Sequence, residues 1–71
     1  EESYLILVDA IEKLPPQMKS IMQLALEGKS NPEIAETLNI SGETVHSQKK
    51  IAYRTLRVYL KDYYYLVFYF L

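Results

Sequence analysis

The cations of residues 41–61, SGETVHSQKKIAYRTLRVYLK, are the side chains best placed to do chemistry in this chain. Read as a helix, the segment brings basic and polar side chains to one side: His46, Lys50, Arg54, Arg57 and Lys61. Residues 43–61 hold five lysines and arginines against one glutamate, whereas residues 1–42 hold three against seven carboxylates. Such a basic segment suits the phosphates of nucleic acid, and a merely solvated charged surface is the alternative.

The opposite side of the same segment has the spacing of a buried helix face. Four apolar residues recur there at intervals of four or seven positions: Val45, Ala52, Leu56 and Leu60. Ser41 has the side chain of an N-cap, which accepts a hydrogen bond from a free N–H one turn ahead. Short polar residues at the start, including Gly42 and Ser47, can enter a DNA major groove. Residues 43–61 are therefore predicted to form a long DNA recognition helix.

Three further helices are predicted before this segment, over residues 3–14, 16–27 and 30–38, because apolar residues recur in each at helical spacing. Together the four segments predict an all-α fold. It would be a small four-helix domain with a three-helix, winged-helix-like DNA-binding core and a long C-terminal helix. A short turn before a basic last helix is typical of a helix-turn-helix, although a plain helical hairpin has the same spacing.

Local residues mark where these helices begin and end. Ser3 can cap the first helix, and Pro16 fits the first turn of the second, where its missing N–H is no loss. Gly28 suits the left-handed residue that closes the second helix. Ser30 and Glu33 have the spacing of a capping box that opens the third.

Length and composition limit the possible functions. Seventy-one residues form one domain, residues 1–71, and a start at Glu1 instead of methionine indicates a fragment of a longer chain. With no cysteine and one histidine, the chain is predicted to bind no metal and no cofactor. The absence of a glycine-rich phosphate loop and of a nucleophile–base pair argues against an enzyme. No apolar run approaches the roughly 20 residues that span a bilayer, so we expect a soluble cytoplasmic module.

Residues 62–71 form an apolar C-terminal tail, which carries no charge from Tyr63 onward. The tail can continue the last helix, fold back on the first or reach a partner. Tyrosine suits an interface, since its ring can be buried while its hydroxyl stays in water. A homodimer formed through the tail is one expectation, and a segment that only closes a small core is the other.

Residues 14–57, LPPQMKSIMQLALEGKSNPEIAETLNISGETVHSQKKIAYRTLR, resemble region 4 of a bacterial RNA polymerase sigma factor. The matching marks, in order, are Leu14-Pro15, Glu27-Gly28-Lys29-Ser30, Glu33-Ile34-Ala35, Leu38-Asn39-Ile40-Ser41, Thr44-Val45, Ala52 and Leu56-Arg57. The resemblance covers residues 4–61 and is greatest to the extracytoplasmic-function (ECF) group in the style of Bacteroidetes. It implies recognition of the promoter −35 element by a domain bound to core RNA polymerase. It also implies docking of the polymerase β-flap on this domain and masking by an anti-sigma factor.

Carried onto this sequence, the resemblance implies that the start of the last helix reads bases. The predicted DNA-binding set is Ser30, Asn31, Ser41, Glu43, Thr44, His46, Ser47, Lys49, Lys50 and Arg54. His46 stands where many relatives have arginine or lysine, and it cannot form arginine's paired contact with guanine. Lys49 can extend its ammonium toward phosphate from a half-buried stem. Ser30 and Asn31, at the start of the preceding helix, are expected to offer free N–H groups to a phosphate.

Alternatives to this interpretation stay open. The effector domain of LuxR-type response regulators has a similar helix-turn-helix, but its recognition helix is usually followed by a turn. Here residues 57–61 contain no glycine or proline. A helical protein-interaction module, with the tail as its binding surface, is the alternative of a different class. Within the last helix, Thr44 as a capping hydroxyl and Glu43 as a partner of the helix dipole are the structural alternatives to base contacts.

Overall fold

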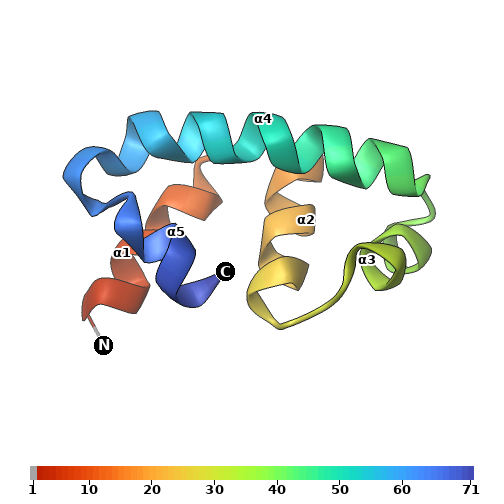
Figure 1. The fold of residues 1–71 in the computed structure, drawn as a ribbon, viewed down its shortest axis with the longest axis horizontal. Helices are drawn as coiled ribbons and strands as arrows, with labels where there is room; N and C mark the ends of the chain where they lie inside the picture. Colours follow the sequence, from red (N-terminus) through yellow and green to blue (C-terminus); the bar gives the residue numbers. More distant parts are fainter. Residues whose placement is uncertain (1) are drawn as a thin grey trace.

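Helix α4 (Gly42–Leu60) runs the length of the molecule, and the other helices lie along one side of it (Figure 1). The computed structural model describes residues 2–71. In these residues the elements are α1 (Glu2–Glu12), α2 (Pro16–Leu26), α3 (Asn31–Leu38), α4, the 3-10 turn η1 (Lys61–Tyr63) and α5 (Tyr65–Phe70), with no strand. The predicted all-α fold is confirmed, and the tail adds a fifth helix to the four that the sequence predicted.

The core lies between α4 and the helices along its inner side. The predicted apolar stripe of α4 is buried in full: Val45, Ala52, Leu56 and Leu60. It packs on apolar side chains from every other helix and from the first interhelical turn: Leu7, Ile11, Leu14, Ile21, Met22, Ile34, Leu66 and Val67. Helices α1, α2 and α3 all contact α4, so this helix is held along its length.

Helix ends follow the local signals of the sequence. Ser41 Oγ accepts a hydrogen bond from the N–H of Thr44 at 3.0 Å, which confirms Ser41 as the N-cap of α4. Pro16 occupies the first turn of α2. Gly28 follows the end of α2 with φ +91°, and its N–H reaches the carbonyl of Ala25 at 2.9 Å. The left-handed residue predicted here is therefore confirmed.

Gly28→Ala should lower the free energy of unfolding by about 1 kcal/mol, because a side chain is strained at positive φ. No atom lies within 4 Å of a Cβ built at this position, so the loss comes from the backbone and not from a clash. Gly42→Ala is the matched control: a Cβ there also meets nothing within 4 Å, but Gly42 is helical and alanine favours helix. Urea unfolding measures both variants, and equal losses would contradict the backbone explanation.

The N-terminal helix differs from its prediction. Helix α1 includes Ser3, which lies inside the first turn, so the prediction of Ser3 as N-cap is wrong. The helix ends at Glu12, two residues earlier than predicted. Leu7 and Ile11 of this helix are buried, whereas Tyr4, at the same helical spacing, is 39% exposed.

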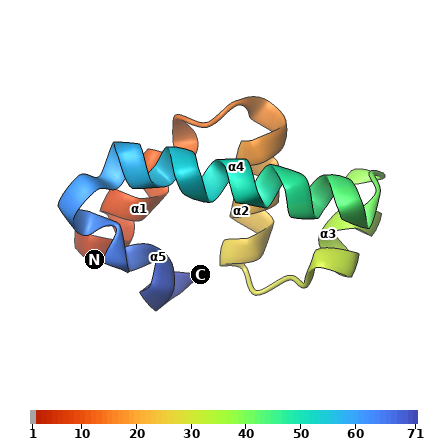
Figure 2. The ribbon, with the colours of Figure 1, turned by 45° about the horizontal axis from the view of Figure 1, so that its top comes forward.

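The tail folds back on the first helix. Helix α4 ends one residue earlier than predicted, and Lys61, with φ +53° and ψ −116°, turns the chain. Helix α5 then lies beside α1, where the rings of Tyr4 and Phe70 pack edge to face with centroids 5.3 Å apart (Figure 2). Leu66 and Val67 of α5 join the core. Of the courses considered for the tail, folding back on the first helix is confirmed, and straight continuation of the last helix is wrong.

Candidate nucleic-acid interface

The turn between α3 and α4 fixes how α4 is presented. Asn39 closes α3 in the left-handed conformation, with φ +56° and ψ +48°, a region that asparagine tolerates better than most residues. The N–H of Ile40 reaches the carbonyl of Ala35 at 3.0 Å, and Ser41 then caps α4. Ile34 of α3 is fully buried in the shared core. Helices α3 and α4 therefore form the predicted helix-turn-helix.

One long side of α4 faces no other helix (Figures 1 and 2). We call this side the outer face, and its exposed polar side chains are Glu43, His46, Ser47, Lys50, Arg54 and Arg57. At a rise of 1.5 Å per residue they extend along about 21 Å of the helix axis. The major groove of B-DNA admits an α-helix. The outer face thus has the form of a recognition surface.

The cations of the outer face have no carboxylate partner within residues 2–71. The ion pairs in that range join Lys13 Nζ to Asp9 Oδ2 at 3.5 Å and Lys19 Nζ to Glu12 Oε1 at 3.8 Å, all outside α4. Lys50, Arg54 and Arg57 lie three or four residues apart, which places them next to one another on a helix surface. Their positive charge is therefore uncompensated and is available to an anionic ligand.

The first turn of α4 combines a cap with polar base-reading candidates. The hydroxyls of Ser41 and Thr44 lie 2.8 Å apart, and the N–H of Thr44 donates to Ser41 Oγ, so both residues take part in the cap. The N–H groups of Gly42 and Glu43 find no partner in the part of the chain that the structure describes. They contribute the positive end of the helix dipole at the edge of the outer face.

The start of α3 is arranged differently from the prediction. The N–H of Ser30 donates to Glu33 Oε1 at 2.8 Å, and Ser30 Oγ accepts from the N–H of Glu33 at 3.3 Å, which confirms the capping box. These bonds to Ser30 lower the pKa of Glu33, with a smaller effect of Lys29. The prediction that Ser30 offers a free N–H to phosphate is therefore wrong, because Glu33 already accepts that bond.

The capping box also lies apart from the outer face. The loop that leads into α3, yellow in Figure 1, runs on the side of the molecule away from the outer face of α4, and Figure 2 agrees. Asn31, the first residue of α3, is half-buried. The structure therefore brings Glu43, His46, Ser47, Lys50 and Arg54 together, but it does not add Ser30 or Asn31 to them.

Lys49 and Tyr53 lie at the edge between the outer face and the core. Both side chains are half-buried. Burial raises the pKa of the Tyr53 hydroxyl, and the neighbouring Tyr64 raises it further. Partial burial of Lys49 is consistent with a lysine whose stem packs on the protein while its ammonium reaches toward solvent.

Two apolar side chains on the exposed half of α4 were not predicted from the sequence. Ile51 and Val58 are 41% and 66% exposed. Thr55, between them, donates its hydroxyl to the Ile51 carbonyl at 2.9 Å. Their spacing of seven residues is out of phase with the buried stripe, and that phase difference is the signal that could have revealed them. Arg57 was also absent from the predicted DNA-binding set, although it lies on the outer face.

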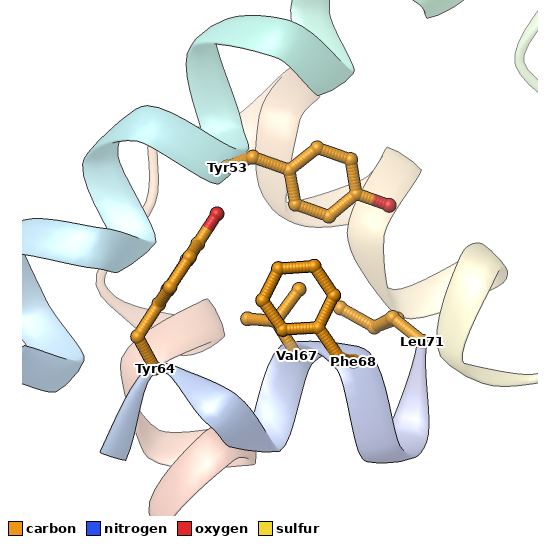
Figure 3. Close-up of a pocket in the computed structure, with 5 residues that line it drawn as sticks. All are labelled: Tyr53, Tyr64, Val67, Phe68 and Leu71. Carbon is orange, nitrogen blue, oxygen red and sulfur yellow. The ribbon is translucent and has the colours of Figure 1, made fainter. Parts of the chain in front are cut away.

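An apolar groove separates α5 from α4. Tyr53, Tyr64, Val67, Phe68 and Leu71 line it, with a volume of about 470 Å³ (Figure 3). The tyrosine rings approach from α4 and from the end of η1, and the other three side chains come from α5 and the residue after it. Helix α5 lies on the inner side of α4 (Figure 1), so the groove that it lines is a surface separate from the outer face.

Within residues 2–71, no three side chains among His, Cys, Asp and Glu come together in a way that could hold a metal ion. None of the helices in that range combines the length and apolar character needed to cross a membrane.

The sequence was compared with protein families, curated proteins and solved structures. The family description "Sigma-70, region 4" matches residues 4–56, three quarters of the chain. No curated protein and no solved structure matches. The match covers α1, α2, α3 and most of α4, including every residue of the predicted DNA-binding set, and lends no support to the LuxR-type alternative. The chain therefore belongs to the sigma-70 region 4 family, whose domains contact RNA polymerase and bind the promoter −35 element as part of a sigma factor.

Proposed function

We propose that the outer face of α4 is the surface that binds the −35 element, within a sigma factor of the extracytoplasmic-function type. The observation that carries this proposal is the uncompensated charge of Lys50, Arg54 and Arg57 on a side of α4 that no other helix covers. Phosphate neutralisation by lysine and arginine supplies much of the affinity for DNA. The acidic residues of this chain lie mainly in α1 and α3, which leaves α4 as its basic surface.

The outer face is proposed to divide between base contacts and phosphate contacts. Glu43, His46 and Ser47 occupy the N-terminal half of the helix, which in a helix-turn-helix meets base edges. Lys50 follows one turn later and can reach a guanine or a phosphate. Arg54 is about 16 Å from Glu43 along the axis and is placed for the DNA backbone. Ser41 and Thr44 hold the start of the helix in place through the cap.

The residues outside this face receive different proposed roles. Lys49 is half-buried, and its ammonium is proposed to reach a phosphate while its apolar stem packs on the protein. Asn31 is proposed to offer DNA its backbone N–H and its side chain. Ser30 is proposed to offer only its hydroxyl, since its N–H donates to Glu33. These two are the weakest members of the set.

The partners of the domain are proposed from its remaining surfaces. The polymerase β-flap is proposed to bind in the apolar groove lined by Tyr53, Val67 and Phe68. An anti-sigma factor is proposed to mask the domain. The sigma factor is proposed to be of the type found in Bacteroidetes. A sigma factor works on the chromosome with RNA polymerase, so we place its activity in the cytoplasm.

The test is footprinting of promoter DNA by the sigma factor that carries this domain, assembled with core RNA polymerase. The variant Lys50→Ala with His46→Ala should lose protection at −35, because it removes one phosphate or guanine contact and one base contact from the outer face. We expect an affinity loss of about tenfold to a hundredfold, from the 1–3 kcal/mol typical of such contacts. Protection elsewhere on the promoter should persist.

The control for this test is Lys13→Ala, which removes a cation that already has a carboxylate partner outside α4. It should leave −35 protection unchanged. If Lys50→Ala with His46→Ala protects −35 as the wild type does, the outer face is not the recognition surface. Polymerase binding without −35 protection in the wild type would leave a polymerase-docking domain only.

A further inference from the structure

We propose that α5 is an exchangeable arm, which opens at Lys61 and docks on α1 of a second copy of this chain while that copy returns its own arm. The product is a reciprocally exchanged dimer. A second copy is the proposed occupant, because its α1 offers the same surface that receives α5 within one chain. This inference goes beyond promoter recognition and does not depend on it.

The hinge of the arm is a strained residue. Lys61 adopts φ +53° and ψ −116°, a combination that a residue with a Cβ rarely takes. No glycine or proline occurs after Gly42, so nothing in the sequence forces the helix to end at Leu60. If the arm opens and Lys61 becomes helical, the strain is released and α4 continues into the tail. Hinges under strain favour exchange between copies.

The apolar pattern of the sequence runs through the hinge without a break. Leu56, Leu60, Tyr63, Val67 and Phe70 follow one another at intervals of four, three, four and three residues. This is the spacing of one continuous apolar stripe on a single straight helix. In the folded-back form the stripe is interrupted, and the Tyr63 side chain is left 49% exposed. In an extended helix Leu56 and Leu60 stay in the core of their own chain, while Tyr63, Val67 and Phe70 continue the stripe toward a second copy.

The folded-back arm is held by side-chain packing, in which the partly buried Phe70 and Leu71 accompany Leu66 and Val67. Helix α5 has six residues, too few to be a stable helix by itself, so it depends on the surface that receives it. Leu66 and Val67 are its buried side chains, and the edge-to-face pair of Tyr4 with Phe70 adds one contact to α1. Phe68 and Tyr69 remain 78% exposed. Exposed aromatic surface of this kind is typical of an interface and gives two exchanged chains further area to bury.

The first experiment compares Lys61→Gly with Lys61→Ala by sedimentation equilibrium of the 71-residue chain. Glycine relieves the strain of the folded-back form and disfavours the extended helix, so Lys61→Gly should weaken the dimer. If glycine favours the folded-back form by about tenfold in each chain, the dissociation constant of the dimer should rise by about a hundredfold, since each dimer opens two arms. Alanine keeps a Cβ at the hinge and favours helix, so Lys61→Ala should dimerise at least as strongly as wild type.

The second experiment asks whether the arms are exchanged. The chain has no cysteine, so Tyr4→Cys and Phe70→Cys place single thiols on two different chains. Dimer isolated from their mixture and treated with a short bis-maleimide should give a covalent heterodimer. One chain carrying both substitutions should instead link to itself when it is dilute and monomeric, which controls for reactivity at the two positions.

Three results would overturn the proposal. The wild-type chain could stay monomeric up to its solubility limit. It could dimerise equally well with glycine at position 61, which would leave the hinge without a role. The mixed dimer could form without the cross-link between chains, which would indicate association of exposed surfaces in place of exchange. None of these results bears on −35 protection, so a failure here is distinguishable from a failure of the proposed function.

Discussion

Val45→Asp is expected to leave the domain unfolded at 25 °C. The Val45 side chain is fully buried in the first turns of α4, among apolar side chains, and no polar side chain of residues 2–71 is buried with which an aspartate could pair. An unpaired carboxylate there lowers the free energy of unfolding by about 4 kcal/mol or more. That loss approaches the whole stability typical of a domain of this size, about 4–10 kcal/mol. Circular dichroism and thermal unfolding measure the outcome.

Ser47→Asp is the matched control for Val45→Asp. It introduces the same charge into the same helix two residues later, but on the exposed outer face. The variant should fold with unfolding free energy close to that of the wild type, because an exposed carboxylate in the N-terminal half of a helix is tolerated. It should nevertheless weaken DNA binding, since it adds a negative charge facing phosphate. If Val45→Asp unfolds cooperatively at the midpoint temperature of the wild type, the position of α4 in the core is contradicted.

Charge reversal at two positions of the outer face, Lys50→Glu with Arg54→Glu, should weaken binding to −35 DNA by about a thousandfold. Each substitution removes a contact worth about 1–3 kcal/mol and replaces it with repulsion of the phosphates. Both side chains are exposed and without an ion-pair partner in residues 2–71, so the fold should be unaffected. Fluorescence anisotropy with polymerase-assembled sigma factor, repeated over a range of salt concentrations, gives the affinity and its salt dependence.

The salt series separates a lost contact from a general effect of charge. Removal of phosphate contacts should make the plot of log affinity against log salt less steep. Lys13→Glu with Lys19→Glu lowers the net charge by the same amount and breaks only two ion pairs outside α4. Exposed pairs of this kind contribute little to stability. If this control weakens binding as much as the α4 variant, affinity depends on total charge and not on the outer face.

The parts of the fold that the sequence predicted are those with local causes. Ser41 and the pair Ser30 with Glu33 act as caps because each hydroxyl reaches an N–H within one turn, which depends on spacing alone. Gly28 takes positive φ because the end of α2 requires it. The buried stripe of α4 follows from helical periodicity, since a helix that packs on one side must place its apolar residues there.

The course of the tail could not be predicted from local causes. Neither Lys61 nor its neighbours carry a signal that ends a helix, and the apolar spacing favours a straight one. The bend forms because Leu66 and Val67 gain burial in the core and Phe70 packs on Tyr4. Tertiary packing therefore overrides the local preference for a straight helix. The apolar spacing of residues 56–70 does not show which other helix the tail will pack against.

The position of the candidate DNA-binding surface could be predicted from the sequence, but not every residue that belongs to it. Periodicity places His46, Ser47 and Lys50 opposite the buried stripe, and the structure has them on the outer face. The capping box predicted for Ser30 and Glu33 already occupies the N–H of Ser30, so it was incompatible with the prediction that this N–H is free for a phosphate.

The unpaired cations of α4 also have a thermodynamic consequence. Lys50, Arg54 and Arg57 are neighbours on one helix surface, and like charges at this spacing repel by a few tenths of a kcal/mol per pair. The folded domain carries this repulsion, while the separated charges of the unfolded chain do not. A duplex bound at the proposed outer face would remove it and would bind only the folded form. Folding and promoter occupancy are thereby linked, so a sigma factor engaged at a promoter holds its region 4 in a more stable state than the free protein does.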